Sequence, residues 1–180
     1  STANTIAWAM EANETGLWNN GLKFGSVEGL SSVFDDIAHR RGIGDELAEG
    51  SKRLSEKYGG KEFAMHSKGL ELAAYEPRRA VGQGLGYAVS NRGGCHLNGG
   101  YLVILEGLGL NVDAQTPKSK ADFTMLFQDL METISASGQC LFTSYAFFPA
   151  FLLTKPNGVI TQTVNKVATH VGGAVRLINK

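Results

Sequence analysis

Apolar side chains recur at helical spacing in three successive stretches of the first sixty residues. Residues spaced i, i+3, i+4 and i+7 share one side of an α-helix, which is the side that becomes buried. The first two stretches are followed by Gly16 and Gly42, and glycine is the usual residue just past a helix end. We therefore predict three helices packed as one block. Their apolar positions are Ile6, Ala7 and Met10; Val27, Leu30, Phe34, Ile37 and Ala38; and Ile43, Leu47, Leu54 and Tyr58.

Helical periodicity returns in the last third of the chain. One helix is predicted to begin after Ser119 and to end at Gly138. Its apolar face consists of Phe123, Leu126, Phe127, Leu130 and Ile134. A second amphipathic segment runs to the C-terminus through Val164, Val167, Ala168, Val171, Val175 and Ile178. No β-type alternation of comparable length occurs, so the predicted fold class is mainly α.

The middle of the chain, between residues 62 and 107, is dominated by turn-forming residues. Residues 82–100, GQGLGYAVSNRGGCHLNGG, hold seven of the chain's 23 glycines. Because glycine loses more conformational freedom on folding than any other residue, we expect short turns and ordered loops here rather than an ordinary helix. The sequence thus predicts a multi-helical protein with two packed helical subdomains and a long glycine-rich irregular segment. The boundary is expected near residues 59–63.

Composition narrows the functional class. The 180 residues include 17 basic and 17 acidic side chains, so the net charge is zero and a nucleic-acid partner is not indicated. Two cysteines are too few for a secreted disulfide framework. The longest apolar stretch, residues 141–153, is interrupted by polar residues and is shorter than the ~20 residues of a membrane-spanning helix. We expect a cytoplasmic protein with no membrane association.

The segment GQGLGY at residues 82–87 invites comparison with nucleotide-binding loops. The dinucleotide fingerprint needs its third glycine one position later and a preceding strand, but Tyr87 stands there and EPRRAV precedes the loop. A phosphate loop of the Walker type needs Gly-Lys-Ser/Thr at its end, which is absent. Nucleotide binding is therefore a minor alternative, testable as affinity for NAD or ATP.

Several residues of this region allow two interpretations. Cys95 and Cys140 are each either a buried structural cysteine or a metal ligand. Iron–sulfur clusters in particular prefer cysteine ligands. His96, between glycines on a tight loop, is either a packed side chain or a proton donor and acceptor beside a bound cofactor. The arginines Arg78, Arg79 and Arg92 either grip phosphate groups or pair with nearby glutamates.

A resemblance to a known family rests on three segments. They are GIGDELAEGSKRLSEKYG at residues 42–59, KGLELAAYEPRRAVGQGLGYAVSNRGGCH at residues 68–96, and LFQDL at residues 126–130 with SGQCLFT at residues 137–143. Over about residues 1–145, in uninterrupted order, the chain resembles the C-terminal half of the core of tungsten-containing aldehyde:ferredoxin oxidoreductases. Residues 146–180 match that family poorly.

The resemblance implies a fold and an activity. Members of the family hold tungsten, or molybdenum, on two pterins beside a four-iron, four-sulfur cluster, and they oxidise small aldehydes to carboxylic acids with ferredoxin as electron acceptor. The family fold has one β-rich domain followed by two mainly helical domains. Residues 1–63 would form the end of the second domain and residues 64–180 much of the third, with the remaining domains of the parent chain and a homodimer partner as neighbours.

The resemblance also implies roles for single residues. His96 corresponds to a histidine near the metal that is suited to proton transfer. Arg92 occupies a pterin-contacting position, and Asn98, Ser135 and Gln139 stand where the family contacts the cofactor. Cys140 corresponds to the distant cysteine that completes the four-iron cluster, whereas Cys95 is assigned to packing.

Departures from the family pattern qualify these roles. Ser135 replaces an aspartate, Gln139 a leucine, and Asn98 a lysine, so charged contacts are lost. Ser31 stands where some members have a histidine that helps hold an iron between subunits, and we expect no such iron. One cysteine cannot hold a four-iron cluster, so we predict that the chain alone carries neither cofactor and is inactive. The alternative is a helical binding or scaffold module that kept the fold and lost the redox site.

Overall fold

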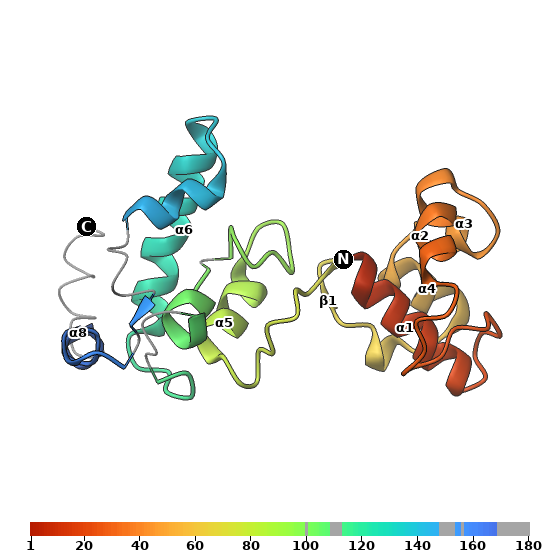
Figure 1. The fold of residues 1–180 in the computed structure, drawn as a ribbon, viewed down its shortest axis with the longest axis horizontal. Helices are drawn as coiled ribbons and strands as arrows, with labels where there is room; N and C mark the ends of the chain where they lie inside the picture. Colours follow the sequence, from red (N-terminus) through yellow and green to blue (C-terminus); the bar gives the residue numbers. More distant parts are fainter. Residues whose placement is uncertain (100, 109–112, 148–153, 156, 169–180) are drawn as a thin grey trace. The chain divides into compact units, whose positions relative to one another are not determined.

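The computed structural model describes residues 1–99, 101–108, 113–147, 154, 155 and 157–168, and these form two units, Ser1–Ala73 and Ala74–Lys180. Helices dominate both units, as predicted, and one two-stranded antiparallel sheet is found in the described residues (Figure 1). The assignment of residues 1–63 and 64–180 to the second and third family domains stays a prediction. No helix of the described part is long and apolar enough to cross a membrane.

The first unit is a small helical block. Its elements are α1 (Thr2–Glu14), α2 (Leu30–His39), α3 (Ile43–Leu47), α4 (Ser51–Tyr58), η1 (Lys61–Phe63), β1 (His66–Ser67) and β2 (Leu70–Glu71). The predicted apolar stripes supply much of its core, which also contains Trp8. The Trp8 indole N–H donates a hydrogen bond to the carbonyl oxygen of Gly60 at 3.1 Å. Trp18 stacks on Tyr58 with ring centroids 4.8 Å apart.

The third predicted helix of this block is two helices, which corrects the prediction. Gly50 separates α3 from α4 and has a φ of 85°, a backbone angle that residues with a side chain rarely adopt. The break is stabilised from a distance, because the buried Glu71 carboxylate accepts hydrogen bonds from the Ser51 N–H at 2.8 Å and the Ser51 hydroxyl at 3.0 Å. The Thr5 hydroxyl donates to the same oxygen at 3.2 Å. Glu71 therefore joins α1, α4 and β2.

The second unit is built around α6 (Lys120–Ala136), which begins after Ser119 and is followed by Gly138 in the left-handed conformation, as predicted. The other described elements are α5 (Val81–Val89), η2 (Ile104–Leu108, a π-helical turn), η3 (Leu141–Phe147) and α8 (Val159–Ala168). The core is formed by residues 101–105 of the chain together with Phe123, Phe127 and Met131 of α6. Val164 of α8 packs on this core, whereas Val171, Val175 and Ile178 lie outside the described residues.

The first part of the glycine run is a helix, which corrects the expectation that residues 82–100 are irregular throughout. α5 contains Gly82, Gly84 and Gly86. A Cβ atom on Gly86 would lie 2.1 Å from the carbonyl oxygen of Gly99, and one on Gly84 would lie 3.0 Å from that of Pro77. The glycines thus let backbone pack on backbone, and this close packing offsets their low helix propensity.

Candidate functional site

The loop that follows α5 carries the candidate residues of the glycine run. Residues 91–99 form successive turns, and their backbone is joined internally where the Cys95 N–H donates to Gly93 at 2.7 Å and the Gly99 N–H donates to Cys95 at 3.1 Å. The close approach of Gly86 and Gly99 seats the end of this loop against α5. We refer to residues 91–99 as the histidine loop.

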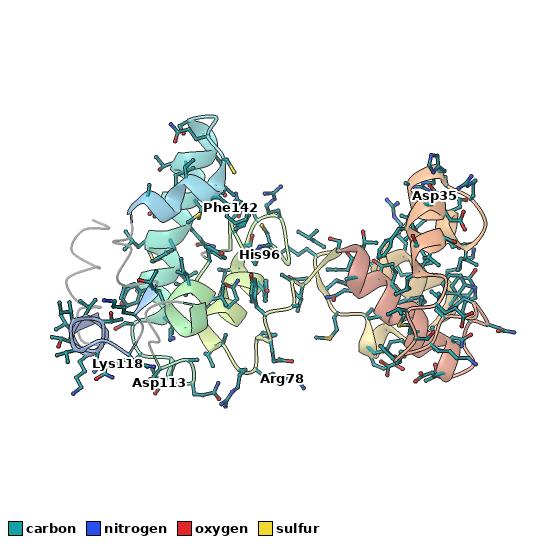
Figure 2. All side chains as sticks on the ribbon, in the orientation of Figure 1. Asp35, Arg78, His96, Asp113, Lys118 and Phe142 are labelled. Atoms are coloured by element: carbon teal, nitrogen blue, oxygen red, sulfur yellow. The ribbon has the colours of Figure 1, made fainter. Side chains whose placement is uncertain are left out.

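His96 is half-buried in this loop (Figure 2) and contacts two aromatic rings. Its imidazole lies 5.4 Å from the ring of Tyr75 and 5.9 Å from that of Tyr101, measured between centroids. Burial disfavours the charged imidazolium and lowers the pKa of His96 below the ordinary value of 6.5. The imidazole is therefore neutral at neutral pH and can accept a proton or a hydrogen bond at one ring nitrogen.

Arg92 and Asn98 are joined to each other and to α6. The Arg92 guanidinium donates to the Asn98 side-chain oxygen at 3.2 Å, and the Asn98 amide nitrogen donates to a Glu132 carboxylate oxygen at 2.6 Å. Asn98 is only 9% exposed, whereas Arg92 and Glu132 are exposed. Sequence reasoning did not identify Glu132, since it lies 34 residues from Asn98 and no local pattern marks it.

Cys95 contributes a free, half-buried thiol beside the same amide. Its sulfur lies 3.9 Å from the Asn98 side-chain oxygen, at the outer limit of a weak S–H···O contact. The structure therefore places Cys95 within the packing of the histidine loop.

Ser135, Gln139 and Cys140 lie at the exposed C-terminal end of α6 and just beyond it. Cys140 is an exposed free thiol whose carbonyl oxygen accepts hydrogen bonds from the backbone N–H and the hydroxyl of Thr143, at 2.9 and 2.8 Å. Ser135 stands one helical turn after Glu132, so both positions fall on the same side of α6. No group of three or more His, Cys, Asp or Glu side chains that could hold a metal occurs in the described part.

The N-terminus of α5, the place where a phosphate loop would bind its ligand, already holds an anion. The Gly82 and Gln83 N–H groups donate to the two carboxylate oxygens of Glu106, at 2.7 and 2.9 Å. Lys120 pairs with Glu106 at 2.5 Å, and both side chains are at most 5% exposed. This internal carboxylate occupies the position that nucleotide binding by GQGLGY requires, which argues against that alternative. A single acid within the apolar run 101–108 was the available sequence signal.

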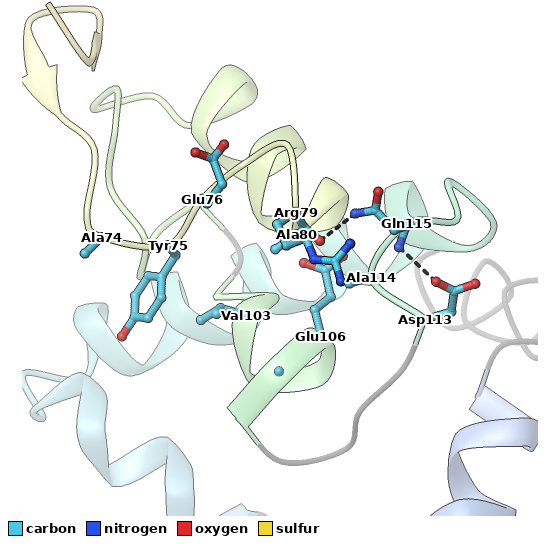
Figure 3. A pocket seen from close by; sticks show the side chains of 11 residues that line it. Ala74, Tyr75, Glu76, Arg79, Ala80, Val103, Glu106, Asp113, Ala114 and Gln115 are labelled. Atoms are coloured by element: carbon cyan, nitrogen blue, oxygen red, sulfur yellow. Dashed lines mark hydrogen bonds between the residues drawn. The ribbon is translucent and has the colours of Figure 1, made fainter.

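A cavity of about 620 Å³ in the second unit is lined in part by Tyr75, whose ring also contacts the His96 imidazole. Its other lining residues come from the segment before α5, from η2 and from residues 113–115 (Figure 3). Gln115 fixes one wall by donating to the backbone carbonyl oxygens of Arg78 and Arg79 at 3.2 and 2.7 Å. Cavities of this size bind small organic molecules or parts of cofactors.

The fold and the site together define a class of protein. It is mainly helical and carries a neutral imidazole on a glycine-rich loop and an exposed thiol at the end of a neighbouring helix. The family model for aldehyde ferredoxin oxidoreductase, domains 2 and 3, matches residues 1–174, which corrects the expectation that the resemblance ends near residue 145. The chain therefore belongs to the aldehyde ferredoxin oxidoreductase family.

Relatives in Thermococcus and Pyrococcus species support this assignment. The chain is 39% identical over 194 aligned positions to proteins named tungsten-containing aldehyde ferredoxin oxidoreductase from Thermococcus kodakarensis and Pyrococcus furiosus. It is 38% identical over 196 positions to the protein of that name from Pyrococcus horikoshii. Each alignment includes 99% of this chain and 32% of the relative, so the chain spans about a third of the length of these relatives.

Proposed function

We propose that this chain is the helical part of an enzyme that oxidises aldehydes to carboxylic acids and passes the electrons to ferredoxin. An aldehyde and one water give the acid, two protons and two electrons, and a bound four-iron, four-sulfur cluster would supply the path by which the electrons reach ferredoxin. The observation that carries the proposal is the half-buried neutral imidazole of His96, packed on Tyr75, in a chain of this family. A base of this kind suits a reaction that releases protons.

His96 is assigned proton transfer at one imidazole nitrogen, or a hydrogen bond to the reacting oxygen. Burial keeps the ring neutral, so it can accept the proton that is released when water adds to the carbonyl carbon. Tyr75 and Tyr101 both contact the ring and limit the access of water to it. Tyr75 thereby links the base to the wall of the cavity.

A tungsten or molybdenum bis-pterin is the cofactor that we assign to this enzyme, and its metal supplies the two-electron redox chemistry when bound. Part of the predicted donor set fits such a group. Arg92 donates through one nitrogen to Asn98 in the described structure, and a guanidinium has five N–H donors, so donors remain for a phosphate. Ser135 and Gln139 are exposed and can donate to or accept from pterin nitrogens. Asn98 fits less well, because it is buried and both ends of its amide are engaged.

Cys140 is assigned as one ligand of a four-iron, four-sulfur cluster. Its thiol is exposed and free, as a ligand to a group at a domain surface must be. Four cysteines hold such a cluster, and the two of this chain are separated in role, since Cys95 packs in the histidine loop. The other three ligands would have to come from outside this chain. We also assign the protein to the cytoplasm and infer that it forms a homodimer.

The test of this proposal is His96→Ala in the complete polypeptide loaded with its cofactors. We expect turnover to fall by about a hundredfold, the typical contribution of a positioned acid or base, while tungsten and iron contents stay normal. His39→Ala is the matched control, because His39 is exposed on α2 and contacts only Asp35 in the described structure. Equal loss of metal and activity in His96→Ala would contradict the role in proton transfer.

The alternative function is a helical scaffold that lacks the redox site, and the departures at Ser135 and Gln139 are the observations that favour it. Metal analysis of the complete polypeptide separates the two functions. Tungsten and about four irons per chain support the enzyme. Their absence after expression with both metals available supports the scaffold.

A further inference from the structure

The amide of Asn98 stands between a cation and an anion, and only one orientation of it satisfies both. Arg92 can only donate hydrogen bonds, and an ionised Glu132 can only accept them. The Asn98 oxygen therefore faces Arg92 and its nitrogen faces Glu132, at 3.2 and 2.6 Å. Rotating the amide by half a turn would set donor against donor and acceptor against acceptor.

In the described residues, this link is a side-chain hydrogen bond that ties the histidine loop to α6. Leu97 packs against the core that includes Met131 of α6, but residues 91–99 also contain Gly93, Gly94 and Gly99, which carry no side chains that could anchor the loop by packing. Their internal backbone hydrogen bonds shape the turns without fixing them to the neighbouring helix. Glu132 acts on this loop from a helix whose buried face, with Phe127 and Met131, belongs to the core of the unit.

We propose that Glu132 is a positioning residue that, through Asn98, fixes the histidine loop on α6 and so sets where the Arg92 guanidinium and the His96 imidazole stand. Asn98 is then the connector of this link and does not contact the cofactor directly. The consequence for turnover rests on the proposed function, whereas the fixation of the loop does not.

Replacing Asn98 alone with the similarly shaped aspartate does not preserve both hydrogen bonds. An aspartate at position 98 would accept from Arg92 but would face the Glu132 carboxylate, and like charges in contact repel. Changing Glu132 to glutamine at the same time supplies an amide that donates to this aspartate. The double variant Asn98→Asp/Glu132→Gln thus rebuilds both hydrogen bonds with the same net charge as the original pair.

The test compares these variants in the complete polypeptide by hydrogen exchange of the backbone amides in residues 91–99. A hydrogen bond to a charged group contributes enough that its loss should speed exchange by about tenfold. We expect this acceleration in Asn98→Asp and in Glu132→Ala, and a return to near the original rate in the double variant. Asp129→Asn, which removes an exposed charge from the same helix, is the matched control and should leave exchange unchanged.

Steady-state kinetics of the loaded enzyme supply the second measurement. We expect Asn98→Asp to lower kcat by about tenfold and the double variant to restore it, because mispositioned catalytic groups reduce turnover. Exchange that stays slow in Asn98→Asp, or that stays fast in the double variant, would overturn the proposal. So would restored exchange without restored kcat. If His96→Ala keeps full turnover, the proposed function fails, and the exchange experiment still decides whether Glu132 fixes the loop.

Discussion

Gly86 of α5 and Gly99 of the histidine loop lie backbone against backbone. A Cβ atom on Gly86 would stand 2.1 Å from the Gly99 carbonyl oxygen, and one on Gly99 would stand 2.4 Å from the carbonyl oxygen of Cys95. These contacts leave no room for a side chain, so the two glycines set the distance between the helix and the loop that carries His96.

Gly86→Ala should therefore destabilise the protein. Forcing a methyl group into a packed backbone contact costs about 1–3 kcal/mol or more, because the loop has to move. Thermal unfolding of the purified protein measures the effect as a lower Tm. Gly107→Ala is the control, since a Cβ atom there meets nothing within 4 Å. Equal Tm values for the two variants would contradict the close packing.

Glu106→Gln should leave Lys120 as a buried charge without its partner. Removing one member of a buried ion pair costs about 3–5 kcal/mol, and Lys120 is only 5% exposed. Urea unfolding should show this loss. The double variant Glu106→Gln/Lys120→Met should recover much of it, because no charge then remains buried. A double variant as unstable as the single one would show that the pairing with Lys120 is not the cause.

The stability of the first unit should depend on pH through Glu71. Desolvation raises the pKa of this carboxyl group, but hydrogen bonds from Ser51, from the Glu71 backbone and from Ser1 together outweigh it and hold the pKa below its ordinary value of 4.5. A pKa that is lower in the folded state gives stability that is present above pH 4.5 and is lost as the pH falls through the folded pKa. Unfolding of the protein and of Glu71→Gln between pH 7 and pH 3 measures this. The difference between them should shrink as the pH falls, and a constant difference would contradict the assignment.

The pKa of His96 should rise when its aromatic cover is removed. Tyr75→Ala admits water to the imidazole and relieves the desolvation that lowers the pKa below 6.5. Histidine hydrogen exchange followed by mass spectrometry reports the pKa of single histidines. His96 in the unchanged protein serves as the reference. An unchanged His96 pKa in Tyr75→Ala would show that Tyr101 and the loop alone bury the ring.

Sequence periodicity predicted the elements whose stability comes from their own amphipathic face. α1, α2 and α6 belong to this group, and Gly138 follows α6 where the pattern placed it. The pattern failed at α5 and at the break between α3 and α4, because both depend on distant groups: Gly99 and Glu106 for α5, and Glu71 for α4.

The candidate site divides in the same way. His96 and Arg92 could be named from the sequence, because residue type and family resemblance marked them. Their partners could not, since Glu132 and Tyr75 reach the histidine loop only through the folded chain. The positions of Ser135, Gln139 and Cys140 near one exposed helix end followed from the predicted end of α6, but their roles stay predictions.

The carboxylate of Glu106 has a consequence for the order in which the second unit folds. α5 is short and contains three glycines, so it has little tendency to form alone, and its first N–H groups are satisfied by a residue 23 and 24 positions further along. During synthesis the ribosome releases α5 well before Glu106 emerges. We expect α5 to stay unstructured until η2 and Lys120 have been synthesised. The histidine loop packs against α5, so it should acquire its shape late in the folding of the unit.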